Sequence, residues 1–399
     1  MGAVCCGICC CAACGKAFGF ANRGIKYSRV PYALLLFLCI LLAVILRNNQ
    51  SSFGFTLYGE ISVQGCGSDC QSDQAVYRVC LALTLFFATH AFIVGALPDH
   101  LSYTFNGGYF LWKFLIFIPL LVSMFYIDAQ RMDEYAQAAR ITSLIFLVIQ
   151  CAAIIDTAYR VNEFMTSKEN VVWDAVNLVA SVGILIGYII CSAFMFVFFT
   201  GGGDCHLEKF ILSTLIIIPI FYTIASVTEV VEHGALFVSA CVSAYSTYVA
   251  YTALAANPSE TCNSTITRAR DSDTWQIVLG IVFTAVSVTY IAYRMGTDSS
   301  RLFGPQKDEE DADLKNHKDT EVGDSNEDEP EKTTKQLQDS GEKSKNVIFH
   351  TVMTFASMYV CMLLTRWSTQ DYSDRESRYL SKENFWVQTS ALWLIMLLY

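Results

Sequence analysis

The sequence has few charged residues for its length. Only 16% of its 399 residues are Asp, Glu, Lys or Arg, whereas 53% are hydrophobic. Soluble globular domains carry about 25% charged residues, so a chain of this composition cannot cover its apolar surface in water. Basic residues are also scarcer than acidic ones, 27 against 37, and no basic stripe alternates with aromatic residues. A nucleic-acid partner is therefore not expected, and the composition predicts a polytopic membrane protein.

The motifs of common catalytic and cofactor sites are missing as well. The sequence contains no nucleophile elbow, no histidine-rich metal motif within an apolar segment and no glycine-rich phosphate loop. The glycine run at 201–203 follows an apolar segment without a phosphate-binding pattern and is interpreted as a turn. We therefore expect no enzymatic activity, no cofactor and no bound metal ion.

What the sequence does have is ten apolar segments of nearly bilayer length. A helix rises about 1.5 Å per residue, and the hydrocarbon layer is about 30 Å thick. Open sheets would leave backbone groups unpaired in lipid, and no β-barrel alternation is present, so the prediction is an all-α membrane fold. The fourth segment is longer and more polar than the rest, which favours a strongly tilted helix buried among its neighbours. The segments are 31–46, 75–97, 109–127, 135–161, 173–200, 209–227, 234–254, 275–293, 347–365 and 385–399.

Basic residues before the first segment predict the orientation of the chain. Lys16, Arg23, Lys26 and Arg29 place the N-terminus in the cytoplasm by the positive-inside rule. No small-residue cleavage site follows, so the first segment is interpreted as a retained anchor. The expected organisation is a cysteine-rich cytoplasmic N-terminus at 1–30, eight helices within 31–295, a loop at 296–345 and two helices within 346–399.

The loop at 296–345 differs in composition from the rest of the chain. It holds 15 acidic and 8 basic residues and almost no apolar ones. Such a segment cannot bury enough surface to offset the entropy lost on ordering. We expect a disordered, acidic cytoplasmic loop that acts either as a solvated spacer or in regulation.

The sixteen cysteines suggest two kinds of chemistry. One set is crowded beside the basic juxtamembrane segment, where S-acylation is favoured over unmodified thiols or over zinc, which needs more room between its ligand pairs. A second set lies in loops on the predicted lumenal side, where disulfides persist, but the sequence leaves the connectivity open. Asn263, in the sequon at 263–265, is expected to carry a glycan. The acylation candidates are Cys5, Cys6, Cys9, Cys10, Cys11 and Cys14, and the disulfide candidates are Cys66, Cys70, Cys205 and Cys262.

Five polar side chains inside apolar segments are candidates for a functional site, because such groups are costly in lipid. Each also has a structural interpretation. The arginine and the lysine could extend to the membrane interface, the histidine could be hydrogen-bonded in the interior, and the glutamine could join helices. The aspartate could pair with Arg160, four residues later on the same helix. The five are Arg78, His90, Lys113, Gln150 and Asp156.

Several stretches together resemble the serine incorporator family. The fourth segment keeps the family spacing Q-x5-D-x-A-x3-N-E, and the ninth keeps the pattern HTVMTFASMYVCMLLTRW. Tyr77-Arg78-Val79 and Asn106-Gly107 open the second and third segments as the family does. Gln388 stands where the family usually has lysine, and Tyr251 where it usually has tryptophan. The resemblance covers nearly the whole chain.

The resemblance implies a fold and a function. The fold is two helical bundles braced by the fourth helix, with a lipid-accessible groove between them. The five polar residues inside apolar segments, above all Lys113, Gln150 and Asp156, are our candidates to line that groove. The function is non-vectorial scrambling of phospholipids such as phosphatidylserine between leaflets. The alternative is a non-catalytic scaffold that promotes serine incorporation into phosphatidylserine and sphingolipids. An ion-coupled transporter is less favoured, because no internal repeat is evident.

The implied partners are membrane phospholipids and, for the scaffold, lipid-biosynthetic enzymes. Association between copies of the chain stays open. The expected location is the endoplasmic reticulum, the Golgi or the plasma membrane.

Overall fold

The computed structural model describes most of the chain. It covers residues 29–48, 68–168, 170–201, 203–228, 235–259, 261–264, 274–297, 328–368 and 381–399. The N-terminal acylation candidates and Cys66 lie outside the described residues, as does the side chain of Cys70.

Every regular element in these ranges is an α-helix, which confirms the all-α membrane fold. Seven helices are long and apolar enough to cross a bilayer: α2, α3, α6, α7, α8, α11 and α14. The shorter apolar helix α5 and the helices α4, α9 and α15 complete the described set. The bounds are α2 Val30–Asn48, α3 Ser68–Ala96, α4 Asp99–Gly107, α5 Phe110–Met124, α6 Ala129–Thr166, α7 Val171–Thr200, α8 His206–Val227, α9 Leu236–Ala255, α11 Thr274–Thr297, α14 Asp328–Leu364 and α15 Lys382–Leu398.

Each of the ten predicted segments overlaps one of these helices, but two elements differ from the prediction. The polar helix α4 was not predicted, because it has too few apolar residues to stand out. Helix α14 begins at Asp328, so residues 328–345 are helical, although we expected them to be disordered. Lys, Gln and Glu, which favour helix, are common in this stretch and allow the membrane helix to continue beyond its apolar part.

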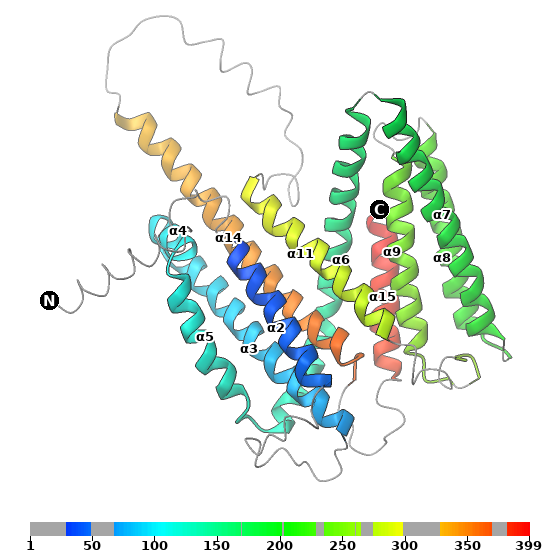
Figure 1. The fold of residues 1–399 in the computed structure, drawn as a ribbon, viewed down its shortest axis with the longest axis horizontal. Helices are drawn as coiled ribbons and strands as arrows, with labels where there is room; N and C mark the ends of the chain where they lie inside the picture. The colour runs from blue at the N-terminus through cyan, green and yellow to red at the C-terminus, as the bar shows by residue number, and fades with distance from the viewer. Residues whose placement is uncertain are drawn as a thin grey trace, which may run out of the picture.

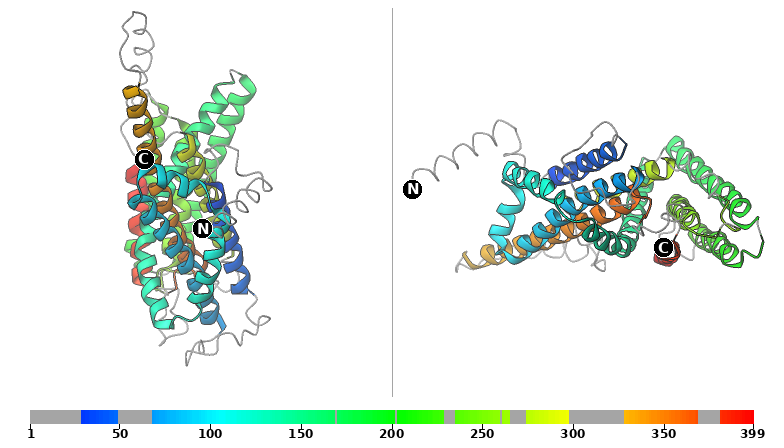
Figure 2. Two further views of the ribbon diagram at one scale, coloured as in Figure 1. Left: turned by 90° about the vertical axis from the view of Figure 1, so that its left-hand side faces the viewer. Right: turned by 90° about the horizontal axis from the view of Figure 1, so that it is seen from below.

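The helices form two groups that lie on either side of α6 (Figure 1). The first group contains α2, α3, α4, α5, α11 and α14, and the second contains α7, α8, α9 and α15. The 38-residue α6 packs against α3, α11 and α14 of the first group and against α7, α9 and α15 of the second. Seen from below, the two groups lie side by side along the long axis of the molecule (Figure 2). Helix α6 therefore connects them.

Small residues bring helices close together in the interior. Helix α9 is buried along most of its length and carries Ser243 and Thr247, whose hydroxyls donate to backbone carbonyls one turn back, at 2.7 and 2.8 Å. Small residues of this kind let membrane helices approach closely. At Gly280 on α11, a Cβ atom would lie 2.4 Å from Leu363 Cδ1 and 2.5 Å from Tyr248 Oη. A larger residue at this position would require the side chains of Leu363 and Tyr248 to shift, so glycine favours the close packing of α11 against α14 and α9.

Near the start of α8, a disulfide joins Cys205 to Cys262, two of the four disulfide candidates. The adjacent Asn263 is only 1% exposed, and its Nδ2 donates to the carbonyls of Ala255 at 3.0 Å and Asn257 at 2.8 Å. The expected glycan at Asn263 is incompatible with this arrangement, because the nitrogen that would carry it is buried and hydrogen-bonded. This amide instead holds the end of α9.

Candidate functional site

A cluster of charged side chains lies between α6 and α11, where the connecting helix packs against the first group. Arg294 Nε donates to Asp156 Oδ2 at 3.1 Å, and the hydroxyl of Tyr290 donates to the same oxygen. Arg160 Nε donates to Tyr290 Oη at 2.9 Å. The side chain of Asp156 is 28% exposed, whereas that of Arg294 is 3% exposed. We call Asp156, Arg160, Tyr290 and Arg294 the seam cluster.

The spacing of these residues explains the arrangement. Asp156 and Arg160 are four residues apart on α6, and Tyr290 and Arg294 are four apart on α11, so each pair lies on one face of its helix. The alternative of an ion pair within α6 is wrong, because the Tyr290 hydroxyl lies between the two side chains and Asp156 pairs with Arg294 instead.

The seam cluster has unused capacity to bind a polar group. Two arginines and one aspartate give it a net positive charge. Within the described ranges, neither the terminal nitrogens of Arg160 nor Oδ1 of Asp156 has a hydrogen-bond partner, and both side chains are partly exposed. A guanidinium group binds phosphate or carboxylate, and a carboxylate oxygen accepts from an ammonium group. The arrangement suits a zwitterionic or anionic group.

Lys113, expected to line a lipid groove together with Asp156, is enclosed away from the seam cluster. It is 5% exposed, and Nζ donates to Tyr32 Oη at 2.7 Å, to the carbonyl of Gly108 at 2.8 Å and to the carbonyl of Phe105. These three bonds use all the protons of an ammonium group. The two carbonyls belong to the end of α4, where the helix dipole also favours a cation. Lys113 therefore caps α4, and its expected place in a lipid groove is wrong.

His90 packs beside this lysine centre. Its Nδ1 lies 2.8 Å from the carbonyl of Phe86, and its ring centroid is 5.5 Å from that of His350 and 5.8 Å from that of Tyr32. The ring is buried among aromatic residues. His90 is thus a hydrogen-bonded interior histidine, which was one of its two interpretations.

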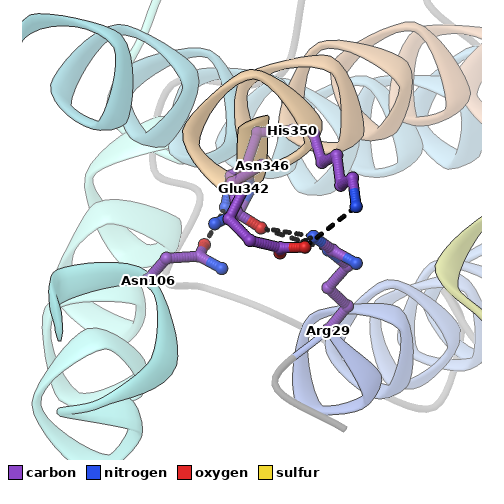
Figure 3. A network of polar contacts seen from close by, with 6 residues as sticks. Arg29, Asn106, Glu342, Asn346 and His350 are labelled. Carbon is purple, nitrogen blue, oxygen red and sulfur yellow. Dashed lines mark hydrogen bonds and ion pairs between the residues drawn. The ribbon is translucent and has the colours of Figure 1, made fainter. Parts of the chain in front are cut away.

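A buried polar network continues from His350 along α14 (Figure 3). The ring Nε2 of His350 lies 2.8 Å from Asn106 Oδ1, and Arg29 donates twice to Asn346 Oδ1, at 2.8 and 3.1 Å. Arg29 also pairs with Glu342 at 3.3 Å. Burial lowers the pKa of Arg29, and the Glu342 carboxylate opposes that shift. The network joins α14 to α4 and to the residue that precedes α2.

The remaining two candidates are also interior contacts. Gln150 is fully buried on α6 and its Oε1 accepts from the hydroxyl of Tyr245 at 3.1 Å, so it joins α6 to α9. Arg78 is buried rather than extended to the interface. It donates to the carbonyls of Gln74 at 3.1 Å and Ile127 at 3.0 Å, and to the side chain of Gln74. Of the five predicted residues, the seam therefore contains only Asp156.

Comparison with known proteins agrees with the residues that suggested a family. The family model described as serine incorporator (Serinc) matches residues 3–399.

The chain belongs to the serine incorporator family.

A probable serine incorporator of Nematostella vectensis is 25% identical, over 98% of this chain and 90% of its own length. One of Dictyostelium discoideum is 27% identical, over 89% and 85%. Human serine incorporator 2 is 24% identical, over 95% and 90%.

For this serine incorporator, sequence reasoning missed half of the seam cluster. Tyr290 and Arg294 lie at the end of the eighth segment, where a tyrosine and an arginine are common interface residues. The signal that could have identified them is their four-residue spacing, which matches that of Asp156 and Arg160. Finding the pair required knowing that α11 packs on α6.

One further group has the composition of a metal site. Cys205, Glu208 and Cys262 place their ligand atoms within 4.8 Å of one another, and all three are buried. The two sulfur atoms are bonded to each other, however, and a metal binds thiolates. In this disulfide form the group is a structural link beside α8.

Proposed function

We propose that this serine incorporator lets phospholipids exchange between the two leaflets and that their headgroups pass the seam cluster. The observation that supports this function is the position of a net positive, partly exposed cluster between the central helix α6 and α11 of the first group. Charged residues within membrane segments are expensive and commonly mark a path for a polar substrate. Lys113, Gln150, Arg78 and His90 have interior partners, so the proposal depends on the seam cluster alone.

The chemistry of the cluster fits a phospholipid headgroup. A headgroup loses hydration when it moves through hydrocarbon, and this makes unassisted exchange slow. The terminal nitrogens of Arg160 can bind the phosphate, while Asp156 Oδ1 can accept from an amine such as that of phosphatidylserine. The acyl chains stay in the surrounding lipid throughout.

A vesicle assay tests the proposal. Purified protein is reconstituted with headgroup-intact, fluorescently labelled phosphatidylserine, and leaflet exchange is followed from the fraction of label that an external reductant can reach. We expect faster exchange than in protein-free vesicles. Arg160→Gln should slow it about tenfold, because a lost charge-assisted hydrogen bond costs about 1.5 kcal/mol. Equal rates with and without protein would contradict the proposal.

The matched control is Arg131→Gln. Arg131 lies on the same helix, but its side chain is 71% exposed and pairs only with Glu134, three residues away, among the described residues. We expect this variant to exchange lipid at the wild-type rate. If both arginine variants slow exchange equally, a general loss of positive charge would explain the effect and the seam cluster would have no specific role.

The relatives are named serine incorporators. We therefore propose as a second candidate a non-catalytic scaffold that promotes serine incorporation into phosphatidylserine and sphingolipids. In that case deletion lowers the flux of labelled serine into these lipids, lipid-biosynthetic enzymes co-purify with the protein, and vesicles that contain the purified protein show no lipid exchange.

Microscopy of a tagged chain would show whether it resides in the endoplasmic reticulum, the Golgi or the plasma membrane.

A further inference from the structure

The helices that face lipid differ in length on the two sides of the molecule. Helix α5 has 15 residues and spans about 23 Å along its axis, which is less than the hydrocarbon thickness of about 30 Å. Helix α7 has 30 residues and spans about 45 Å. The two helices lie in different groups, on opposite sides of α6 (Figure 1).

On α5 the exposed apolar face is short and closed at both ends by aromatic residues. Its exposed large residues run from Leu111 to Val122. Tyr109 and Trp112 are exposed at one end and Tyr126 at the other, and aromatic residues of this kind gather at membrane interfaces. Tyr109 and Tyr126 are seventeen positions apart, so they would be separated by about 26 Å even in one straight helix. Tilt reduces the height of any helix along the membrane normal, on α5 and on α7 alike.

On α7 the exposed apolar face is much longer. Large apolar side chains are exposed from Val176, beyond the interfacial Trp173 and Asp174, to Val197. These positions are twenty-one residues apart, or about 32 Å, and no charged residue occurs from 175 to 203. The neighbouring α8, with 22 residues, also exposes apolar side chains along its length, from Leu207 to Val227.

The first turns of α7 add an apolar groove. It is shallow and open, and every residue that lines it is valine or alanine: Val171, Val172, Ala175, Val176, Val179 and Ala180.

From these lengths we infer that the protein binds a bilayer of unequal thickness, with the hydrocarbon layer thinner beside α5 than beside α7. The partner on both faces is the acyl chains of phospholipids, which adapt to a short apolar face by local thinning. The step in thickness falls across α6, the helix that carries Asp156 and Arg160. This inference does not depend on lipid exchange.

Nitroxide depth measurements test the step directly. The label is attached to a genetically encoded ketone residue, because the exposed native Cys191 would react with a thiol-specific label. Labels replace Tyr109 and Tyr126 beside α5, and Val176 and Val197 on α7, in vesicles of dioleoylphosphatidylcholine. Accessibility to a water-soluble nickel chelate is compared with accessibility to oxygen, which concentrates in hydrocarbon. Labels at Ile116 and Ile186, exposed in the middle of each helix, serve as matched deep controls.

We expect both tyrosine positions to be several-fold more accessible to nickel than both valine positions, although the tyrosines are closer together along the chain. The inference is overturned if the tyrosine labels are as shielded as the valine labels. It is also overturned if Val176 and Val197 are as accessible as the tyrosines, because the two apolar faces would then be equal in height. These measurements report only the depth of the labels. A negative result here would leave the exchange proposal unaffected, and a negative exchange assay would leave this inference unaffected.

Discussion

Lys113 and Arg160 are both basic residues within apolar helices, yet the fold uses them in opposite ways. Lys113 is enclosed, with its ammonium group bonded to three oxygens at and near the end of α4. Arg160 gives one hydrogen bond to Tyr290 and keeps its terminal nitrogens accessible at the seam. The difference shows that a basic residue in lipid is not by itself a sign of transport. What matters is whether nearby backbone carbonyls already accept all the hydrogen bonds that the basic group can donate.

The comparison predicts the largest stability effect at the enclosed lysine. In Lys113→Met the side chain keeps much of its volume, but three buried oxygens lose their donor. Each unsatisfied buried acceptor costs about 1–3 kcal/mol, so the total loss is about 3 kcal/mol or more. Thermal unfolding in detergent, followed by tryptophan fluorescence, should show a clear fall in midpoint. Arg131→Gln is the control, since its exposed ion pair with Glu134 contributes little. A wild-type midpoint for Lys113→Met would show that the enclosure is not maintained in solution.

A second enclosed group is predicted to have a smaller effect. Asn263→Ala removes two hydrogen bonds to the end of α9 and should lower the free energy of unfolding by about 2 kcal/mol. The same burial predicts that the wild-type protein carries no glycan at this asparagine. The test is glycosidase digestion of wild-type protein and of Asn263→Gln, both made in a eukaryotic host. We expect the two proteins to show the same change in electrophoretic mobility. A shift that depends on Asn263 would mean that this segment is open while the chain folds.

The smallest predicted effect concerns the ion pair between Arg29 and Glu342. Glu342 keeps 21% of its side chain exposed, and Arg29 has Asn346 as a second partner. We expect a coupling free energy of about 0.5–1 kcal/mol from a double-mutant cycle with Arg29→Gln and Glu342→Gln. A coupling of several kcal/mol would indicate that the contact between the start of α2 and α14 is as well shielded from water as the surroundings of Lys113.

Much of the fold could be predicted from the sequence because bilayer length imposes a strong pattern. Apolar runs located ten of the eleven described helices, including the shorter α5 and α15. The polar α4 and the start of α14 could not be located in this way, since neither is apolar. Only tertiary packing decides that carbonyls of Phe105 and Gly108 surround Lys113 and that Asn263 faces inward.

The site was harder to predict, because it too depends on tertiary packing. Asp156 stood out as a carboxylate in an apolar segment, but its partners come from α11, more than 130 residues later. Four-residue spacing suggested Arg160 as the ion-pair partner, and only the approach of α11 reveals Arg294 in that position. Local spacing placed Asp156 and Arg160 on one face of α6 correctly, but it could not show that α11 packs against that face.

The most direct test of the account compares Arg160→Gln with Lys113→Met in the leaflet-exchange assay, with each rate divided by the amount of folded protein. The account predicts that Arg160→Gln keeps a near wild-type unfolding midpoint and exchanges lipid about tenfold more slowly. Lys113→Met should unfold at a lower temperature but exchange lipid at the wild-type rate per folded molecule. The reverse pattern, with exchange lost in Lys113→Met and retained in Arg160→Gln, would contradict the central role of the seam cluster.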